Sequence, residues 1–317
     1  MSRNDRERVL VTGGAGFIGS HLVEALVADG HPVRVLDDLS TGRASNLDSV
    51  RDRIEFIEAS ASDFSACERA TRGVAYVFHE AAIPSVPRSV AEPLPSHESG
   101  PTATLNVLEA SRRAGVRRVM FAASSSAYGE SPTLPKVETM LPDPLSPYAA
   151  GKLAGEHYVR VYARTMGLDG VSLRYFNVFG PRQDPSSPYS GVISLFIKAM
   201  ARGDRPKVYG DGLQTRDFTY VADVVRANLA AMRRESPLGG RALNVGGGRS
   251  VSLLDLVAAL NAILGTDLRP EFLPARAGDV RDSLAGLDRI AEELGYKPSV
   301  DFAEGLRRTV ASVVEAA

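Results

Sequence analysis

The chain has 317 residues, of which 44% are hydrophobic and 24% charged, and its net charge is −1 at pH 7. These values are typical of a globular protein with one large domain or two, and they give no electrostatic reason to expect nucleic acid or an anionic membrane as a partner. The single cysteine, Cys67, excludes a disulfide framework and a cysteine-based metal cluster, and we expect no metal site. The charged N-terminus does not look like a signal peptide, and no apolar run has membrane-spanning length. We therefore expect a soluble, cytoplasmic protein.

Short β-branched segments alternate with longer amphipathic segments through the first half of the chain. Near-continuous apolar strands separated by helices indicate a parallel sheet that is covered on both faces. We therefore predict an α/β fold with a Rossmann-type doubly wound parallel sheet. The predicted strands are RVLVTG (8–13), PVRVLDD (32–38), IEFIEAS (54–60), AYVFHEAA (75–82), RVMFAASSS (118–126) and VSLRYFNVFG (171–180).

The first predicted strand runs into a glycine-rich turn and then a helix, in the stretch VLVTGGAGFIGSHLVEAL. Gly13, Gly16 and Gly19 lie three residues apart, and Phe17 and Ile18 open the helix. Glycines let the backbone approach a pyrophosphate, and a helix N-terminus offers N–H groups and a favourable dipole. This order predicts a dinucleotide-binding turn. The alternative is a tight turn in an unrelated α/β protein.

The second predicted strand ends in two acids, Asp37 and Asp38. A carboxylate at this place can accept hydrogen bonds from both adenosine ribose hydroxyls and would repel a 2′-phosphate. The pair therefore favours NAD over NADP as the cofactor. For Asp38, a solvated charge at a strand end is the alternative interpretation.

The stretch SPYAAGKLAGEHY predicts a helix that begins near Ser146 and Pro147. In such a helix Tyr148 and Lys152 lie one turn apart on one face. Taken alone, this spacing also fits an ordinary surface helix with an exposed lysine.

After about residue 180 the sequence becomes rich in proline, glycine and polar residues, as in PRQDPSSPYSG and VYGDGLQTRDFTY. We predict that residues 1–177 and 216–246 form an NAD-binding domain. Residues 178–215 and 247–317 are expected to form a smaller C-terminal α/β substrate domain. The segment ALNVGGG (242–248) should return to the NAD-binding domain as a strand.

Seven segments together resemble the extended short-chain dehydrogenase/reductase family and, within it, the nucleotide-sugar 4-epimerases. They are TGGAGFIG, DDLSTG, HEAAIPSVPRS, SSSAYG, SPYAAGK, RYFNVFGPRQDP and TRDFTYVADV. The similarity extends from Val9 to about Gly295. It implies reversible C4 epimerisation of a UDP-sugar through a 4-keto intermediate, with tightly bound NAD.

By this resemblance Tyr148 is the catalytic tyrosine, Lys152 its lysine, and Ser124 the serine that contacts the sugar's 4-oxygen. A free phenol has a pKa near 10 and is a poor base at neutral pH. We expect the Lys152 ammonium and the positive nicotinamide ring to lower the pKa of Tyr148. Further NAD contacts are implied for the DDLSTG loop and for residues after the predicted strands: Ser40, Thr41, Gly42, Ser60, Ala61, Ala81, Ala82 and Tyr175.

The resemblance also implies a set of residues that contact the nucleotide sugar. Asparagine and arginine side chains suit the diphosphate, and an aspartate suits a ribose diol. A solvated surface charge is the alternative for any single arginine. The implied residues are Ser124, Ser125, Ser126, Tyr148, Asn177, Val192, Arg216, Arg276, Asp279 and Ser283.

Ser283 occupies the position that gates the sugar pocket in this family. A serine leaves room for a 2-acetamido group, which favours UDP-N-acetylglucosamine and UDP-N-acetylgalactosamine over UDP-glucose and UDP-galactose. Ser125 and Ser126 stand where sugar 4,6-dehydratases carry an Asp-Glu pair, which argues against a dehydratase. Three alternatives stay open: a UDP-glucuronate epimerase or decarboxylase, for which Arg182 could bind the carboxylate, a dehydrogenase that releases NADH, and a non-catalytic NAD-binding sensor.

Three positions depart from the family pattern. Ser60 replaces an aspartate expected beside the adenine, and Glu80 stands where apolar residues or glutamine are common. Gly100 replaces an asparagine and is followed by Pro101. Because proline is tolerated only at a first helical turn, we expect a break near Gly100 and a new helix from Pro101. By resemblance, the amphipathic helices 101–114 and 148–165 would pair with their mates in a homodimeric four-helix bundle.

Overall fold

The computed structural model describes residues 6–184, 191–275 and 280–314. The chain divides into two compact units. The first comprises Met1–Ala127, Ser146–Arg174 and Val225–Leu243, and the second Tyr128–Leu145, Tyr175–Val224 and Asn244–Ala317.

This division differs from the sequence-based one mainly at residues 128–145 and 216–224, which the sequence analysis assigns to the NAD-binding domain. Residues 128–145 group with the second unit because their backbone bonds to it. Lys136 N donates to Leu284 O at 2.7 Å, and Gly286 N donates to Lys136 O at 2.8 Å.

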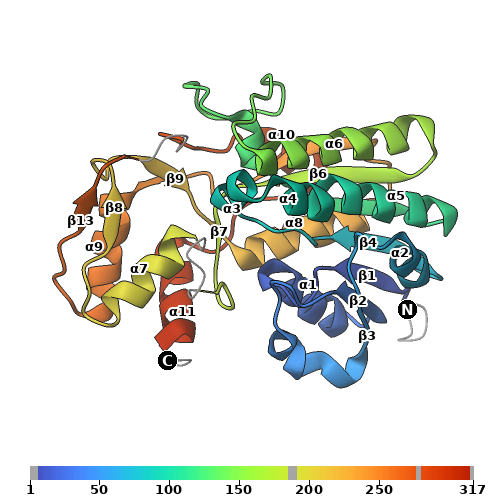
Figure 1. Cartoon of the computed structure of the whole chain (residues 1–317), viewed down its shortest axis with the longest axis horizontal. Coiled ribbons are helices and arrows are strands. Elements are labelled where there is room, and N and C mark those ends of the chain that lie inside the picture. The colour runs from blue at the N-terminus through green and yellow to red at the C-terminus, as the bar shows by residue number, and fades with distance from the viewer. Residues whose placement is uncertain (1–5, 185–190, 276–279, 315–317) are drawn as a thin grey trace. The chain divides into compact units, whose positions relative to one another are not determined.

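A seven-stranded sheet forms the centre of the first unit, in the order β11-β6-β5-β4-β1-β2-β3 (Figure 1). The pairs β3/β2, β2/β1, β1/β4 and β4/β5 are parallel. The Rossmann-type prediction is therefore confirmed, and the segment after residue 240 joins the sheet beside β6. The strand predicted at 171–180 ends at Tyr175, and Val178–Phe179 form a separate short strand, β7, that pairs with β10 (Thr219–Tyr220). The strands are β1 (Val9–Thr12), β2 (Val33–Asp37), β3 (Ile54–Glu58), β4 (Tyr76–His79), β5 (Arg118–Ser124), β6 (Asp169–Tyr175) and β11 (Arg241–Val245).

Helices cover this sheet because alternate strand residues are apolar on both faces. Leu10, Leu36, Val77 and Val119 join a core cluster with residues from α2, α5 and α6. The strand order reverses at β1, which lies between β4 and β2, and ligands of open α/β sheets bind outside the carboxyl ends of the strands at such a point. The helices of this part are α1 (Phe17–Ala28), η2 (Ala44–Arg53), α2 (Phe64–Thr71), α3 (Val86–Ala91), α4 (Pro93–His97), η3 (Glu98–Thr102), α5 (Ala103–Arg113), η4 (Ser125–Tyr128), α6 (Pro147–Thr165) and α8 (Val221–Arg233).

The expected helix break at Gly100 is wrong. Residues Glu98–Thr102 form a π-helical turn that leads directly from α4 into α5, with helical backbone angles at both of its flanking residues. Proline lacks the N–H of an α-helical hydrogen bond and its ring collides with the carbonyl four residues earlier. A π turn is wider, so it accommodates Pro101 without ending the helix.

Helix α6 begins as predicted. The Ser146 hydroxyl accepts a hydrogen bond from Ala149 N at 3.2 Å, and Pro147 occupies the first helical position. Tyr148 and Lys152 therefore lie in the first two turns of a 19-residue helix. In Figure 1, α6 runs beside α5.

The described residues of the second unit form short strands and four longer helices. Each small sheet has two strands: β10 with β7, β12 with β9, and β13 with β8. Phe179, Phe218 and Phe302 pack their rings together with centroids 5.7–6.2 Å apart. The elements are β7 (Val178–Phe179), α7 (Val192–Met200), β8 (Lys207–Tyr209), β9 (Thr215–Asp217), β10 (Thr219–Tyr220), β12 (Ser250–Ser252), α9 (Leu253–Leu264), β13 (Glu271–Leu273), α10 (Asp288–Leu294) and α11 (Phe302–Val314).

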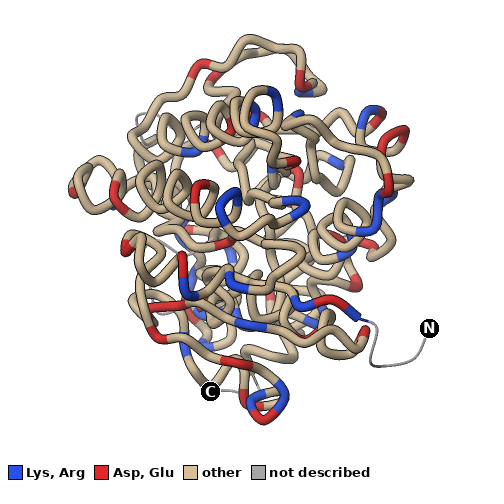
Figure 2. Tube along the Cα trace, turned by 90° about the vertical axis from the view of Figure 1, so that its right-hand side faces the viewer, with Lys and Arg blue, Asp and Glu red and all other residues tan. Residues whose placement is uncertain are grey.

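Charged residues of both signs are interspersed along the chain, as Figure 2 shows. Among the described residues, no helix is both long enough and apolar enough to cross a membrane.

Candidate active site

The glycine turn after β1 is packed so closely that side chains are excluded. A Cβ atom on Gly13 would lie 2.6 Å from Ala81 N, and one on Gly19 would lie 2.1 Å from Gly13 O. Gly13 also has a φ of +69°, which L side chains rarely adopt. Two of the three predicted glycines are therefore required by the fold of the turn itself.

At the start of α1, backbone N–H groups face the glycine turn without a capping side chain. Gly16 is the N-cap, no side chain caps it, and the first turn contains no acidic residue. The first N–H groups of a helix have no partner within the helix and attract anions. A pyrophosphate fits this arrangement, in which Phe17 and Ile18 supply the first helical N–H groups.

The two acids after β2 have different environments. Asp37 is buried, and its carboxylate accepts from Ala15 N at 2.9 Å and from Leu39 N at 2.8 Å. Burial raises the pKa of Asp37, although these two bonds oppose the rise. Asp38 is exposed. Partial burial would raise its pKa, but hydrogen bonds from Ser40 and Ser60 outweigh that effect and lower it.

Ser60 is thus a partner of Asp38, which gives a local role to one of the three departures from the family pattern. A carboxylate offers about four acceptor positions, so Asp37 and Asp38 retain the capacity to accept ribose hydroxyls. These observations fit NAD.

A chain of neutral hydrogen bonds lies under the carboxyl ends of β1 and β4. Thr12 Oγ1 is 2.7 Å from His79 Nδ1, and His79 Nε2 is 3.1 Å from Thr104 Oγ1. Thr104 donates to Gly100 O at 2.8 Å, so its oxygen accepts from His79. Burial, followed by the nearby Lys152 charge, lowers the pKa of His79 to about 3, so the imidazole is neutral. The chain joins the glycine-turn strand to the π turn.

Three hydroxyl groups line up at the end of β5. Ser126 Oγ donates to Ser124 Oγ at 2.8 Å, and Ser124 in turn is hydrogen-bonded to the Tyr148 side chain. Burial raises the pKa of Tyr148, and the hydrogen bond with Ser124 opposes this rise. Because Ser124 Oγ accepts from Ser126, its own proton is available to the phenol oxygen. The structure therefore brings Ser124, Ser126 and Tyr148 together.

Lys152 is 6% exposed, and its ammonium donates to Ala122 O at 2.7 Å. Its nitrogen lies 5.1 Å from the centre of the Phe121 ring and 5.9 Å from that of Tyr148. Burial lowers the pKa of Lys152 to about 8, and the carboxylates of Glu80 and Glu156 limit the fall.

The expected effect of Lys152 on the tyrosine is not present in the protein alone. Burial raises the pKa of Tyr148, the bond from Ser124 opposes this, and Glu80 adds to the rise. The lysine is held by a backbone carbonyl instead of the phenol. In this structure the chain's own residues keep Tyr148 protonated at neutral pH.

In the second unit, two residues proposed for the nucleotide sugar, Asn177 and Ser283, share one hydrogen-bond network. The Ser283 hydroxyl accepts from Asp217 N at 3.2 Å and from Asn177 Nδ2 at 3.3 Å. Arg216 precedes Asp217 on β9, and its guanidinium donates to Thr215 O at 2.9 Å and to Arg281 O at 3.1 Å. Asn177 has a φ of +22°, which is strained for a residue other than glycine.

Asp217 anchors this network. It is fully buried and accepts from Gly247 N at 2.7 Å, Gly248 N at 3.1 Å and Ala285 N at 2.9 Å. Burial raises its pKa to about 6, against the lowering effect of these three bonds.

The other predicted residues lie at strand ends and helix starts. Val192 is the first residue of α7, and Tyr175 ends β6. Arg276 and Asp279 lie outside the described residues. Ser125 and Ser126 are in η4, Thr41 and Gly42 follow β2, Ala61 follows β3, and Ala81 and Ala82 follow β4.

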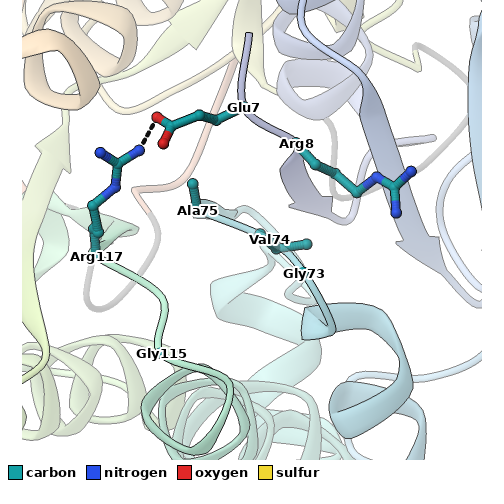
Figure 3. Close-up of a pocket in the computed structure, with 7 residues that line it drawn as sticks. All are labelled: Glu7, Arg8, Gly73, Val74, Ala75, Gly115 and Arg117. Carbon is teal, nitrogen blue, oxygen red and sulfur yellow. Dashed lines mark ion pairs between the residues drawn. The ribbon is translucent and has the colours of Figure 1, made fainter. Parts of the chain in front are cut away.

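A shallow depression of about 430 Å³ lies elsewhere, at the amino ends of β1, β4 and β5 (Figure 3). Glu7 and Arg117 form an ion pair across it, and Arg8 and Gly73 also line it. It contains none of the predicted site residues. Because ligands of such sheets bind at the carboxyl ends, we assign it no part in the site.

The fold and the glycine turn define a Rossmann-type dinucleotide-binding protein with a tyrosine–lysine pair. The model of the NAD dependent epimerase/dehydratase family matches residues 9–246. The chain belongs to this family, and its cofactor is NAD.

The relatives and solved structures agree over nearly the full length. A UDP-glucose 4-epimerase of Mycolicibacterium smegmatis is 44% identical, over 96% of this chain and 97% of its own. A UDP-N-acetylglucosamine 4-epimerase of Methanobrevibacter ruminantium, in complex with UDP-N-acetylmuramic acid, has a TM-score of 0.94 and 39% identity, covering 98% of this chain and 99% of its own. A UDP-glucose 4-epimerase of Thermus thermophilus in complex with NAD has a TM-score of 0.90 and 39% identity, covering 98% and 100%.

Sequence reasoning gave no role to two residues of this site. Glu80 was noted as unusual, and only the structure shows its charge acting on Tyr148 and Lys152. Asp217 stands inside the TRDF motif beside Arg216, but its partners are 30 and 68 residues away. In the sequence, only the position of Asp217 next to Arg216 in the TRDF motif could have indicated its role.

Proposed function

We propose that the protein catalyses reversible C4 epimerisation of a UDP-sugar, most readily UDP-N-acetylglucosamine and UDP-N-acetylgalactosamine. The observation that carries the proposal is the hydrogen bond between Ser124 and Tyr148, one helical turn from the buried Lys152. The names of the full-length relatives, which include 4-epimerases of both UDP-glucose and UDP-N-acetylglucosamine, support the reaction class.

NAD, when bound, supplies a reversible hydride acceptor for C4 of the sugar. The glycine turn and the N-terminus of α1 would hold its pyrophosphate, and Asp37 and Asp38 its adenosine ribose. Lys152 would hold the nicotinamide ribose hydroxyls.

Within the chain, Ser124 is placed to relay the proton of the sugar's 4-hydroxyl to the Tyr148 oxygen. Because the half-buried phenol is protonated in the protein alone, its ionisation requires positive charge close by. In our proposal the Lys152 ammonium, 5.9 Å from the centre of the Tyr148 ring, supplies part of that charge once NAD is bound. Tyr148 then returns the proton after the 4-keto sugar has turned over, so that no net proton is consumed.

In our proposal Asn177, Arg216 and Ser283 bind the nucleotide sugar, together with Val192, Ser125 and Ser126. Anchoring through UDP suits an epimerase because both sugar orientations must be tolerated. Ser283 supports the acetamido sugars because its side chain is small and is held in place by Asp217 N and Asn177. Arg276 and Asp279 keep their proposed roles by resemblance alone.

Incubation with UDP-N-acetylglucosamine, UDP-glucose and UDP-glucuronate separately, each with NAD, tests the proposal, with products resolved by NMR. We expect the 4-epimer from the acetamido sugar, and a rate at least about 100-fold lower for Tyr148→Phe, the usual scale of lost acid–base catalysis. Tyr76→Phe, at the amino end of β4 and outside the predicted site, is the matched control and should leave the rate unchanged.

The alternatives predict other outcomes. Product from UDP-glucose alone would keep the mechanism and overturn the choice of sugar. Product from UDP-glucuronate alone would favour the epimerase or decarboxylase in which Arg182 binds the carboxylate. Release of NADH would indicate a net dehydrogenase. Tight NAD binding without any product would favour the sensor.

We further propose a homodimer built on α5 and α6. Leu105 on α5, and Tyr158 and Val161 three residues apart on α6, are 36–48% exposed, so both helices offer apolar side chains that a partner could cover. Sedimentation of the purified protein should show a dimer at micromolar concentration. A monomer at that concentration would contradict the bundle.

A further inference from the structure

The glycine run at residues 246–248 lies against the buried carboxylate of Asp217 in the second unit. A Cβ atom on Gly246 would lie 2.9 Å from Asp217 Oδ2, and one on Gly247 would lie 3.1 Å from Asp217 Oδ1 and 2.5 Å from Phe218 O. Gly247 N and Gly248 N donate to this carboxylate at 2.7 and 3.1 Å. The run therefore leaves room for the carboxylate to approach, and two of its N–H groups bind it.

The same carboxylate also holds the segment that contains Ser283. Asp217 Oδ2 accepts from Ala285 N at 2.9 Å, two residues after Ser283. On the other side of Ser283 the segment is bound to Thr215. Thr215 N donates to Arg281 O, and Ser283 N donates to Thr215 O, both at 3.2 Å. Ser283 thus lies between two attachments to β9, one of which is the Asp217 side chain.

The peptide groups of Asp217 hold two side chains that we propose for the nucleotide sugar. Asp217 N donates to Ser283 Oγ at 3.2 Å, and Asp217 O accepts from Asn177 Nδ2 at 3.2 Å. Asn177 Nδ2 also donates to Ser283 Oγ at 3.3 Å. The places of both side chains therefore depend on where the Asp217 backbone lies, and the carboxylate joins that backbone to the glycine run and to Ala285.

Asp217 itself has no surface to offer a ligand, because it is fully buried. Burying a carboxylate is costly, but hydrogen bonds in a low dielectric are strong and fix their donors at defined positions. The contacts of Asp217 thus suit a residue that acts on a ligand through other side chains.

We propose that Asp217 is a positioning residue for the nucleotide sugar: its carboxylate binds residues 247, 248 and 285 to β9 and so sets the places of the Ser283 and Asn177 side chains. The inference rests on the proposed function, in which these two side chains bind the substrate. It gives the glycine run a part in substrate binding without contact with the ligand.

Asp217→Asn tests this, because an amide keeps the size of the side chain but has one acceptor oxygen instead of two. Whichever way the amide is turned, at least one of the N–H groups that bind the carboxylate faces its NH2 group instead. We expect KM for the UDP-sugar that the wild type turns over to rise roughly tenfold, the scale of one lost hydrogen bond, with kcat changed less than about twofold. Assays at pH 8 keep the wild-type carboxylate ionised, since burial raises its pKa only to about 6.

Asp223→Asn is the matched control within the same unit. Asp223 is 1% exposed and accepts from Ser299 N at 3.2 Å and from Val300 N at 3.3 Å. Neither of these partners is proposed to bind the sugar, so the variant should lose stability without a change in KM. Equal increases of KM in the two variants would show that Asp217 acts only through general stability and would overturn the proposal.

A double-mutant cycle with Ser283→Ala separates positioning from a purely structural role. If Asp217 acts through Ser283, the increase of KM in the double variant should fall clearly short of the product of the two single increases. The cycle of Asp223→Asn with Ser283→Ala should give the full product. A full product in both cycles would contradict the proposal.

Hydrogen exchange of the wild type gives a readout that does not need a variant to fold. Saturation with the UDP-sugar should slow exchange at residues 246–248, which we do not propose to touch it, and leave residues 299–300 unchanged. Unchanged exchange at 246–248 would overturn the inference. Failure of the wild type to bind or turn over any UDP-sugar would instead overturn the proposed function, and this inference with it.

Discussion

The buried arginines of the first unit and the buried Asp217 of the second unit are stabilised in different ways. In the first unit, Arg174 is paired with Glu156, and Arg118 with Asp169 at 2.5 Å, while the buried Asp37 of the same unit is held by the backbone N–H groups of Ala15 and Leu39. In the second unit, the buried carboxylate of Asp217 is held by three backbone N–H groups.

This difference determines what each unit tolerates. Removal of one partner of a buried ion pair leaves the other charge uncompensated, so the first unit should be sensitive to single substitutions. A buried carboxylate that only backbone N–H groups hold has a different pKa in the folded and unfolded states. The stability of the second unit should therefore depend on pH.

The largest expected effect is that of Arg118→Met. Arg118 binds Asp169 and also donates to Ala231 O at 2.6 Å, Arg234 O at 2.7 Å and Ser236 O at 2.9 Å. Methionine keeps the length but none of the donors, so we expect a loss of about 3–5 kcal/mol in the free energy of unfolding. Urea denaturation measures it. Arg113→Met, an exposed arginine paired with Glu109, is the control and should change little. Equal losses of unfolding free energy in the two variants would contradict the idea that buried ion pairs make the first unit sensitive to single substitutions.

The pH dependence of Asp217 gives the next effect. Its pKa is raised from 3.8 to about 6 in the fold, so its contribution to stability is full below pH 3.8 and is lost as the pH rises through 6. The shift corresponds to at most about 3 kcal/mol.

Asp217→Asn should remove this pH dependence. We expect the difference in unfolding free energy between wild type and variant to favour the wild type more at pH 4.5 than at pH 7.5. Urea denaturation at the two values measures it, with Asp267→Asn at an exposed position as the control. If the difference is the same at both values, the backbone bonds outweigh burial and the comparison fails.

The smallest expected effect concerns the uncharged hydrogen-bond chain of the first unit, which contains His79 and Thr104. Thr104→Val removes the acceptor of His79 Nε2 and the donor to Gly100 O. A buried donor left without its partner costs about 1–3 kcal/mol, and we expect the lower part of this range because the π turn can adjust. Thr165→Val, where an exposed hydroxyl bonds Val161 O, is the matched control. A loss as large as that of Arg118→Met would show that paired charge is not what distinguishes this unit.

The parts of the fold that were predictable are those encoded by neighbouring residues. The strands are short β-branched runs, and the glycine turn was recognisable because a strand and a helix flank it. The Tyr148–Lys152 spacing became informative once Ser146 and Pro147 marked a helix start. Each signal lies within about a dozen residues of the feature that it predicts.

The remainder depended on contacts between distant segments. Glu80 acts on Lys152 from 72 residues away, a relation set by strand order. The raised pKa of Tyr148 follows from its burial, which no local pattern encodes. At Pro101 the preference of proline for the first turn of a helix predicts a break in the helix. In the structure the helix continues through the wider π turn instead.

The π turn at Glu98–Thr102 bears on how the length of this chain can change in evolution. A π turn contains one residue more than an α-helical turn, so it corresponds to a one-codon insertion in an otherwise regular helix. Loss of the Pro101 codon would turn this segment into a regular α-helical turn and leave Val107 and Leu108 directed at the sheet. The same loss inside α5 would rotate every later side chain by about 100° and remove them from the core. The turn is thus the place where this helix can gain or lose a residue without losing its buried face.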